Sequence, residues 1–327
     1  MEDVMGFDDG DGGGNRGEEE RNFSAYRATL LVFSASLIWG SSFPAVKWGL
    51  NLGLDPLFFV IFRFLVAFIV ALPLLIYLLK GKGFFESFSS AFLILGLLNA
   101  LALIFQFYGM ELTTAGKSAL LINLNVVFVA IISYKFLGES FSFKKVLSVF
   151  IGVFGAILVT TEGKLETVSS KTFLGDMMVL SAGFLWAVFI IMSKKWLDNP
   201  RENSSAQGGL ITNLWVIIIT TLFLLLLLPL TDTGDVLKLE WKEVCVIVYL
   251  GLFCTVLAFG AWYVSLEEME ATTSAVWLLL EIVFAVILSV LLLSEKISFF
   301  IVSGGILIGS AILFILLEEI ERKNEKI

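Results

Sequence analysis

The sequence has no histidine at all, and only two cysteines and five prolines among its 327 residues. Without histidine the chain cannot build a histidine proton relay or a Ser-His or Cys-His nucleophile. Cys245 and Cys254 are nine residues apart and fall on opposite faces of a helix, which disfavours both a disulfide and a shared metal. We therefore expect no enzyme, no metal site and no cofactor.

Charge is scarce as well. Charged residues make up 16% of the chain, whereas a soluble protein carries about 25%. Hydrophobic residues make up 58%, the mean hydropathy is +0.93, and apolar runs of about 20 residues recur, as in membrane-spanning helices. The pattern predicts an all-α polytopic membrane protein. The net charge of −8 comes mostly from residues 1–20, which hold eight acids and one arginine, so we expect no nucleic-acid partner.

Ten apolar segments are long enough to cross a bilayer, and short polar connections separate them. They lie at roughly 27–47, 57–79, 90–110, 118–135, 144–161, 175–194, 208–230, 244–266, 272–292 and 298–318. The polar linker at 162–174 divides them into a first five-helix repeat at 26–161 and a second at 175–318. We expect residues 1–25 to form a disordered acidic cytoplasmic tail, and residues 319–327 a cytoplasmic C-terminal tail.

The distribution of basic residues predicts the orientation, because lysine and arginine concentrate on the cytoplasmic side of a membrane. With the N-terminus inside, the inner segments hold fourteen basic residues and the outer ones seven. Both termini are therefore expected in the cytoplasm, with the protein in the cell membrane. Its expected partners are the lipid bilayer and a small-molecule substrate; a homodimer stays an open alternative that nothing in the sequence supports.

The two halves of the chain resemble each other. In the segment Leu30–Trp48, Trp39 and Lys47 recur as Trp186 and Lys194, 147 residues later. Further matches follow at offsets of 155 or 156, among them Phe107-Tyr108 with Trp262-Tyr263 and Gly138-Glu139 with Ser294-Glu295. Because each half has an odd number of spans, the second half enters the bilayer upside down. Inverted repeats are characteristic of secondary transporters, whose substrate site lies near the midplane between the halves.

Several motifs resemble those of a known family. They are Ile38-Trp39-Gly40-Ser41-Ser42-Phe43-Pro44, Arg63 in Phe62-Arg63-Phe64-Leu65, Leu137-Gly138-Glu139 and Leu293-Ser294-Glu295. Over about residues 27–318 the chain resembles the drug/metabolite transporter superfamily, specifically its ten-span EamA-type members. The resemblance implies ten helices, with spans 1, 3, 4, 6, 8 and 9 around a central cavity and spans 5 and 10 as support. Where the family often has a proline, this chain has Asn125-Val126 and Glu281-Ile282, so we expect straighter fourth and ninth spans.

Glu281 lies near the middle of the ninth span, where an ionised carboxylate costs about 2.5–3.5 kcal/mol on insertion scales. Two hypotheses stay open for it: a proton-coupling or amine-binding acid, and a residue that hydrogen-bonds between helices. Ser274 and Glu281 share a helix face with Trp277, and Ser118 and Asn125 occupy the matching positions of the first repeat. These two polar stripes favour a shared lumen, because polar groups facing lipid would stay unsatisfied.

The residues expected to bind the substrate are the polar and aromatic side chains of these spans. They are Trp39, Ser42, Asn99, Gln106, Ser118, Asn125, Trp186, Thr255, Trp262, Tyr263, Ser274 and Trp277, with Glu281 as the candidate for ion or proton coupling.

Six further residues are expected to serve structure or gating: Pro44, Lys47, Arg63, Glu139, Lys194 and Glu295. Pro44 interrupts the first span, and we expect that span to bend during transport. Lys47 and Lys194 suit the negative ends of helix dipoles, with a gating role as the alternative. Arg63 lies close enough to the outer interface to extend toward it, where we expect it to tie helix ends together through backbone carbonyls or a loop acid. Both glutamates are expected to accept backbone N–H groups at helix starts.

The function predicted from these features is secondary transport of a small organic solute by alternating access. One central acid and one peripheral arginine offer little to a multiply charged anion, which needs several cationic groups. Aromatic walls suit a neutral, zwitterionic or aromatic metabolite, with amino-acid efflux as the specific expectation. The alternatives are an intramembrane enzyme acting on lipid-linked substrates, and a channel.

Overall fold

The computed structural model describes residues 12–79, 83–136, 143–163, 170–198, 208–231, 239–268 and 271–324, and throughout these ranges the regular elements are helices. Helices satisfy every backbone N–H and C=O internally, which apolar segments require in a bilayer. The elements are α1 Gly12–Asn51, α2 Pro56–Leu79, α3 Ala91–Leu112, α4 Ala115–Ile122, α5 Asn125–Phe136, α6 Phe143–Thr161, α7 Lys171–Leu197, α8 Gly209–Leu225, the short η2 Leu228–Leu230, α9 Trp241–Tyr249, η4 Leu250–Leu257, α10 Ala258–Glu268, α11 Ala271–Leu293 and α12 Phe299–Asn324.

Within the described residues, five helices are long and apolar enough to cross a membrane. They are Tyr26–Asn51, Pro56–Leu79, Ala91–Leu112, Lys171–Leu197 and Trp241–Glu268. Shorter apolar helices lie at Ala115–Val129, Val146–Val159, Gly209–Leu225, Leu280–Leu293 and Phe299–Ala311. The prediction of an all-helical polytopic membrane protein is confirmed at this level.

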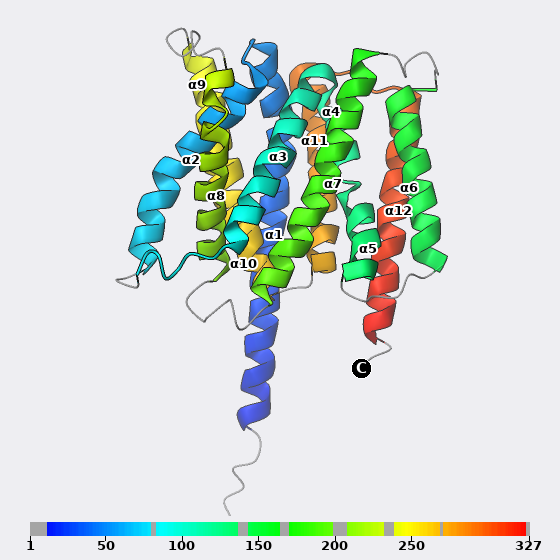
Figure 1. The fold of residues 1–327 in the computed structure, drawn as a ribbon. Coiled ribbons are helices and arrows are strands. Elements are labelled where there is room, and N and C mark those ends of the chain that lie inside the picture. The colour runs from blue at the N-terminus through cyan, green and yellow to red at the C-terminus, as the bar shows by residue number, and fades with distance from the viewer. Residues whose placement is uncertain are drawn as a thin grey trace, which may run out of the picture.

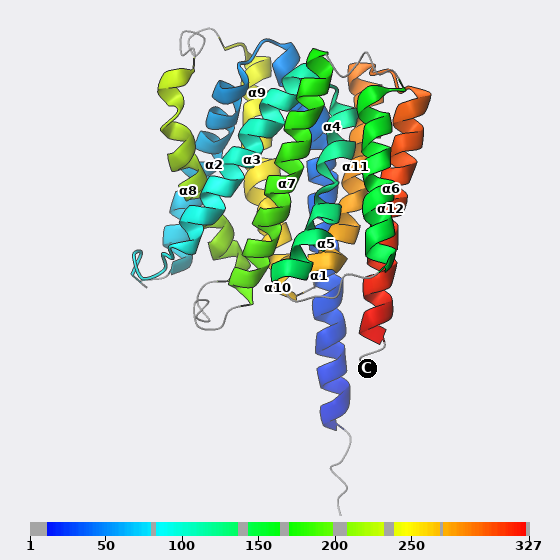
Figure 2. The same ribbon diagram turned by 45° about the vertical axis from the view of Figure 1, so that its right-hand side comes forward.

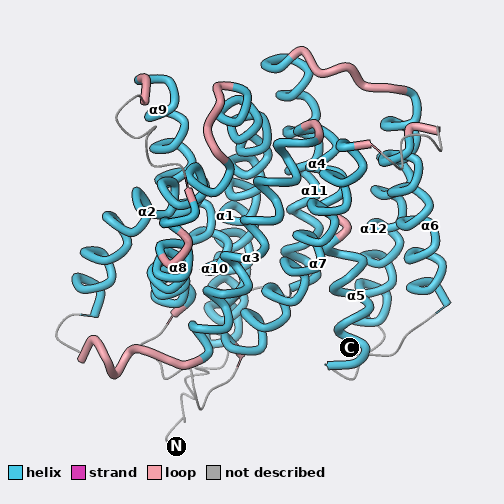
Figure 3. The backbone as a smooth tube through the Cα atoms, turned by 45° about the horizontal axis from the view of Figure 1, so that its top comes forward, coloured by secondary structure: helices cyan, strands magenta, loops and turns pink. Residues whose placement is uncertain are grey.

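The helices form one bundle around α1. Helix α1 packs along α11, α3 along α7, and α6 along α12, and the α6–α12 pair forms one side of the bundle (Figures 1 and 2). The start of α1 and the end of α12 lie at the same end, which we call the base (Figure 1). Helices α2, α4, α7 and α12 begin at the opposite end, the top, which comes forward in Figure 3.

Helix α1 begins at Gly12 and extends beyond the base of the bundle (Figure 1). The sequence predicts a disordered tail over residues 1–25, and the structure instead has helical backbone from Gly12 onward, while residues 1–11 lie outside the described residues. Glutamate and arginine are good helix formers, so the run Glu18–Arg21 can continue the helix that the apolar segment begins.

The fourth apolar segment is broken, contrary to the expectation of a straight span. Helix α4 ends at Ile122 and α5 begins at Asn125, with a turn at Asn123–Leu124. The side-chain Nδ2 of Asn123 donates to the carbonyl oxygen of Ala119 at 2.9 Å. A side-chain donor that takes a helical carbonyl competes with the backbone and bends the chain without any proline. Helix α11 continues unbroken through Glu281, as expected.

The helix that crosses between α9 and α10 contains a π-helical segment, η4. The hydroxyl of Thr255 donates to the carbonyl oxygen of Leu250, five residues earlier, at 2.9 Å. Gly251 lets this segment approach α2 closely, since a Cβ there would lie 2.8 Å from the carbonyl oxygen of Arg63. π-helical turns occur frequently at functional sites, and this one adjoins the cavity described below.

Candidate functional site

A cavity lies among the helices of the bundle, and the space within it and at its open mouth amounts to about 640 Å³. Its walls come from α1, α2, α3, the α4–α5 turn, α7, α10 and α11, and none of its lining residues belongs to the described parts of α6 or α12. The lining residues are Trp39, Ser42, Phe43, Arg63, Leu103, Gln106, Ile122, Asn123, Asn125, Trp186, Phe189, Ile190, Phe259, Trp262, Leu278 and Glu281.

Most of the residues that line the cavity fall into pairs separated by one of two spacings along the chain. Fourteen of the lining residues form seven pairs, one member from each half of the sequence. Three pairs are 147 residues apart: Trp39–Trp186, Ser42–Phe189 and Phe43–Ile190. Four are 156 residues apart: Ile122–Leu278 and Asn125–Glu281, and, one residue away from the match of Phe107 with Trp262, Leu103–Phe259 and Gln106–Trp262. Duplicated segments therefore place corresponding side chains around one cavity.

The two members of a pair often differ in chemistry. Two hydrogen-bonding residues of the first half correspond to an aromatic residue and an acid of the second, Ser42 to Phe189 and Asn125 to Glu281, and Gln106 of the first half faces a cavity that the second half lines with Trp262. One wall of the cavity is therefore richer in hydroxyl and amide groups, and the other is richer in aromatic rings. Such a cavity can orient a solute that has a polar end and an apolar end.

The aromatic wall is held together by ring contacts and one hydrogen bond. The ring of Trp39 meets that of Phe259 edge-on at a centroid distance of 4.8 Å. The indole Nε1 of Trp39 donates to the carbonyl oxygen of Cys254 at 2.9 Å. Phe189 stacks on Trp262 at 6.3 Å and 22°. These contacts fix the rings before any solute arrives.

The indole Nε1 of Trp262 differs from that of Trp39. The side chain of Trp262 is 2% exposed, and its Nε1 is buried without a hydrogen-bond partner among the described residues. A buried N–H without an acceptor is costly, of the order of 1–3 kcal/mol. Because Trp262 lines the cavity, a bound solute could supply the missing acceptor.

Glu281 lines the cavity from α11 and makes no hydrogen bond or ion pair within the part of the chain that the structure describes. Gly40 of α1 allows α11 to come this close: a Cβ there would lie 2.9 Å from the carbonyl oxygen of Glu281 and 2.7 Å from Cβ of Phe284. The glycine of the first apolar segment thus places the central acid beside the cavity.

Arg63 does not extend to an outer interface, and that expectation is corrected. Its side chain is 3% exposed and lines the cavity from α2. The guanidinium Nε donates to the hydroxyl of Thr255 at 2.8 Å, and the rings of Phe64 and Phe107 lie within 6 Å of its central carbon. The close contact at Gly251 brings the π-helical segment to Arg63, so the arginine finds a partner inside the bundle.

Six of the twelve predicted binding residues line the cavity. They are Trp39, Ser42, Gln106, Asn125, Trp186 and Trp262. Arg63 and Glu281, which were predicted for other roles, line it as well. Eight lining residues were not predicted at all: Phe43, Leu103, Ile122, Asn123, Phe189, Ile190, Phe259 and Leu278. The repeat spacing of 147 residues, applied to the predicted Ser42, would have identified Phe189; the others have no predicted residue at the matching position, and the apolar side chains among them give no local signal that separates a cavity wall from helix packing.

The remaining predicted binding residues contact other helices. Asn99 donates to the hydroxyl of Thr220 on α8 at 2.9 Å. Tyr263 exchanges a hydrogen bond with Ser193 at 3.0 Å. Ser118 donates to a carbonyl oxygen of its own helix at 2.8 Å.

The hydroxyl of Thr255 accepts a hydrogen bond from Arg63, which itself lines the cavity. The ring of Trp277 packs against that of Phe33 at a centroid distance of 6.1 Å. The side chain of Ser274 lies outside the described residues. Helix–helix hydrogen bonds and packing therefore account for polar side chains that share a face with lining residues.

Both lysines contact the C-terminal carbonyls of a neighbouring helix, whereas the sequence suggested their own. The Nζ of Lys47 donates to the carbonyl oxygens of Met110 and Glu111, at 2.8 and 3.1 Å, at the end of α3. The Nζ of Lys194 donates to the carbonyl oxygen of Leu266, at 3.1 Å, near the end of α10. The last carbonyls of a helix have no helical donors, so an ammonium group there donates hydrogen bonds to them and interacts favourably with the negative end of the helix dipole.

Glu295 accepts backbone N–H groups at a helix start, but the helix is α4 instead of the following α12. Its two carboxylate oxygens accept from the backbone nitrogens of Ala115 and Gly116, at 2.8 and 3.0 Å. Its counterpart Glu139 lies outside the described residues. Pro44 lies inside α1, which continues as one helix to Asn51.

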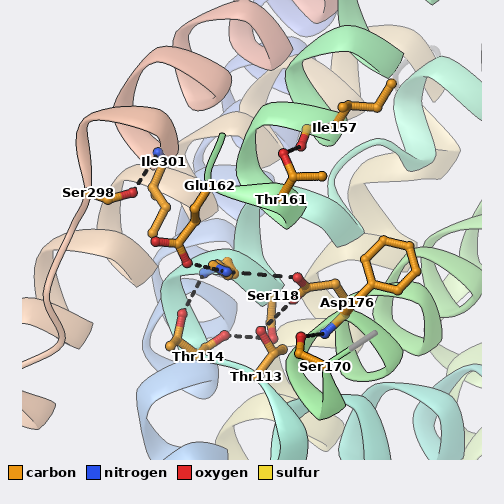
Figure 4. Close-up of polar contacts among 12 residues, drawn as sticks. Thr113, Thr114, Ser118, Ile157, Thr161, Glu162, Ser170, Asp176, Ser298 and Ile301 are labelled. Carbon is orange, nitrogen blue, oxygen red and sulfur yellow. Dashed lines mark hydrogen bonds and ion pairs between the residues drawn. The ribbon is translucent and has the colours of Figure 1, made fainter. Parts of the chain in front are cut away.

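A second group of buried charges lies at the top of the bundle, where α3 ends and α4 begins. The Nζ of Lys117 lies 2.5 Å from a carboxylate oxygen of Glu162 and 3.9 Å from one of Asp176. The hydroxyl of Thr113 donates to the other oxygen of Asp176 at 2.5 Å. Figure 4 shows Glu162, Asp176 and Thr113 converging from three segments. We call these four residues the Lys117 cluster.

Comparison with protein families identifies the chain. The model of the EamA-like transporter family matches twice, at residues 27–161 and again at residues 173–317. The chain therefore belongs to the EamA-like transporter family, and the predicted resemblance to the drug/metabolite transporter superfamily is confirmed. It is an integral membrane transporter and not an enzyme.

Individual relatives agree with the family. A protein of Archaeoglobus fulgidus named "Uncharacterized transporter" is 32% identical over 85% of this chain and 93% of its own length. A protein of Escherichia coli named "Probable amino-acid metabolite efflux pump" is 26% identical over 85% of this chain and 91% of its own. A crystal structure with a TM-score of 0.59 and 17% identity, covering 89% of this chain and 96% of that one, shows the same fold.

Proposed function

We propose that this transporter is a secondary transporter that binds a small organic solute in the central cavity and moves it by alternating access. The observation that carries the proposal is the cavity itself, lined by residues of both halves, among them five pairs at matching repeat positions. In transporters built from repeats, the substrate site lies where the repeats meet. A site formed by both related halves can be exposed to either side when one half rocks against the other.

We further propose that the chain spans the membrane ten times, as two inverted five-helix repeats. The five long and five shorter apolar helices support this number, and the two matches of the family model support the division. Helix α1 runs from base to top and its counterpart α7 from top to base (Figure 1). The bias of basic residues supports cytoplasmic termini in the cell membrane. Pro44, which lacks a backbone N–H, is the proposed position at which α1 bends.

The proposed solute is a neutral, zwitterionic or aromatic metabolite, with amino-acid efflux as the leading case. Aromatic rings form much of one wall, and the lining residues include one arginine and one acid. A multiply charged anion such as a sugar phosphate would need several cationic groups. The efflux pump among the relatives is named for amino-acid metabolites, which agrees with this choice. Glu281 is the proposed site of proton coupling.

Counter-flow in proteoliposomes tests the proposal. Liposomes loaded with an unlabelled metabolite panel should take up labelled solute of the same kind, with saturable kinetics that a channel would not show. Ser42→Trp, which fills the cavity, should abolish the flux, whereas Leu93→Trp, on an exposed face of α3, should preserve it. Absence of protein-dependent flux for every solute in the panel would refute a transport function.

A further inference from the structure

Two opposite charges share the cavity without meeting. Arg63 enters it from α2 and Glu281 from α11, and no ion pair joins them in the described part of the chain. A buried charge without a partner is costly, and in a membrane interior such a charge faces a cavity or a functional partner. The cavity therefore contains one group that can bind an anion and one that can bind a cation.

Arg63 is positioned to bind a carboxylate. Thr255 accepts a hydrogen bond from the guanidinium Nε, and no other hydrogen bond of this guanidinium is present among the described residues. The flat guanidinium presents its donors as a fork that matches the two oxygens of a carboxylate. The hydroxyl of Thr255 also donates to the carbonyl oxygen of Leu250 in the π-helical turn, and this second hydrogen bond fixes the position of the acceptor that orients the guanidinium.

Glu281 is positioned to accept an ammonium group. Its carboxylate has no donor within the described residues, and Gly40 holds its helix against α1. The rings around Trp262 leave an apolar surface beside these two charged groups. A solute with a single charge would satisfy Arg63 or Glu281 and leave the other uncompensated, whereas a zwitterion satisfies both.

We propose, on the basis of the transport function proposed above, that the substrate is a zwitterion with one carboxylate, one ammonium group and an apolar or aromatic side chain. Arg63 binds the carboxylate, Glu281 binds the ammonium group in its ionised form, so that the ammonium group and the coupling proton bind to it in turn, and the aromatic wall receives the side chain. Arg63 is thus the residue that determines specificity for a carboxylate-bearing solute.

Three compounds that differ only in charge test the proposal. L-phenylalanine carries both groups, 3-phenylpropionate lacks the ammonium group, and phenethylamine lacks the carboxylate. Binding to the purified protein is measured from the rise in melting temperature in detergent and from quenching of tryptophan fluorescence. The wild-type protein should bind L-phenylalanine more tightly than either single-charge compound.

Variants of the two charged residues should change the preference in opposite directions. Arg63→Gln should weaken L-phenylalanine binding roughly 10- to 100-fold, the scale of a lost charge-assisted pair, and leave phenethylamine binding unchanged. Glu281→Gln should weaken L-phenylalanine and leave 3-phenylpropionate unchanged. Arg63→Lys keeps the charge without the fork and should fall between wild type and Arg63→Gln. Arg27→Gln, at the exposed base of α1, should behave as wild type.

The outcomes separate this proposal from the transport function. If the wild-type protein shows no preference for L-phenylalanine over the two single-charge compounds, the zwitterion proposal is overturned. Equal loss of all three compounds in Arg63→Gln while Arg63→Lys binds as wild type would also overturn it, because the charge would then serve only the fold. Counter-flow of another solute with no response to the three compounds would leave transport intact and reject the zwitterion.

Discussion

The central cavity and the Lys117 cluster both hold buried charges, but they treat them in opposite ways. In the cluster, Lys117 is 2% exposed and lies between two carboxylates. Asp176 is fully buried and accepts a hydrogen bond from the hydroxyl of Thr113. In the cavity, Arg63 has a single hydroxyl partner and Glu281 has none among the described residues. Loss of one member of a buried pair leaves the other charge uncompensated and destabilises the fold, whereas charges held apart in a cavity are available to a ligand.

The difference follows from position as well as from pairing. The cluster joins the end of α3, the start of α4, the end of α6 and the start of α7, where several helix ends need polar partners. The cavity charges lie within helices whose backbones are already satisfied. Removing a charge should therefore lower stability at the cluster and change solute recognition at the cavity.

The largest expected effect is on stability, in Lys117→Met. Removing this ammonium leaves Asp176 buried without a cation, and breaking a buried pair from one side costs about 3–5 kcal/mol. Thermal unfolding of the purified protein in detergent measures the loss. The double variant Lys117→Met/Asp176→Asn should recover much of it, and an unchanged melting temperature in Lys117→Met would break the comparison.

Glu281→Gln should change transport without lowering stability. The carboxylate has no partner to lose within the described residues, and neutralising it relieves the cost of a charge at mid-membrane. Uptake driven by a pH gradient should fall to the level of protein-free liposomes, while solute exchange persists in part. Glu111→Gln, an exposed acid at the end of α3, is the matched control. Gradient dependence that survives in Glu281→Gln would refute the coupling role.

Thr255→Val should weaken solute binding by a smaller amount. The substitution removes the acceptor that orients the guanidinium of Arg63 but keeps the size of the side chain. One such hydrogen bond contributes about 1 kcal/mol, so the dissociation constant for L-phenylalanine should rise roughly fivefold. Thr255→Ser retains the hydroxyl and should restore binding. Wild-type affinity in the valine variant would show that Arg63 needs no positioning.

The smallest effect distinguishes two tryptophans that undergo the same substitution. Trp39→Phe removes a hydrogen bond to the carbonyl of Cys254 and should cost about 0.5–1.5 kcal/mol of stability. Trp262→Phe removes an N–H that has no partner in the described residues, so stability should stay the same or rise. Melting temperatures of the two variants, measured side by side, test this. Equal destabilisation would mean that the indole of Trp262 is satisfied without a solute.

Local sequence signals predicted much of the fold. Apolar runs with short polar connections predicted helices, because chain segments in a bilayer must satisfy their own backbone groups. The motif from Ile38 to Pro44 and the two LxE sequences predicted the family, which the family model confirms. The break at Asn123–Leu124 was not predicted, because it depends on which donor captures one carbonyl oxygen and not on composition.

The site was predicted where the repeat and the helical period agree. Trp39, Trp186, Asn125 and Glu281 sit at matching positions of duplicated helices, and all four line the cavity. Asn99 shares a helix face with a lining residue but donates to Thr220 on α8. Helical periodicity shows which residues share a face, but it does not show which neighbour covers that face.

The sequence by itself determined the helical membrane class, the duplication and the transporter family, because these depend on hydropathy, spacing and motif. The tertiary structure alone decided which charges are paired. Lys117 became part of a buried cluster and Arg63 part of the cavity because segments more than 40 residues away along the chain were brought to each of them. Pairing depends on contacts between distant segments, and a one-dimensional pattern carries no record of those contacts.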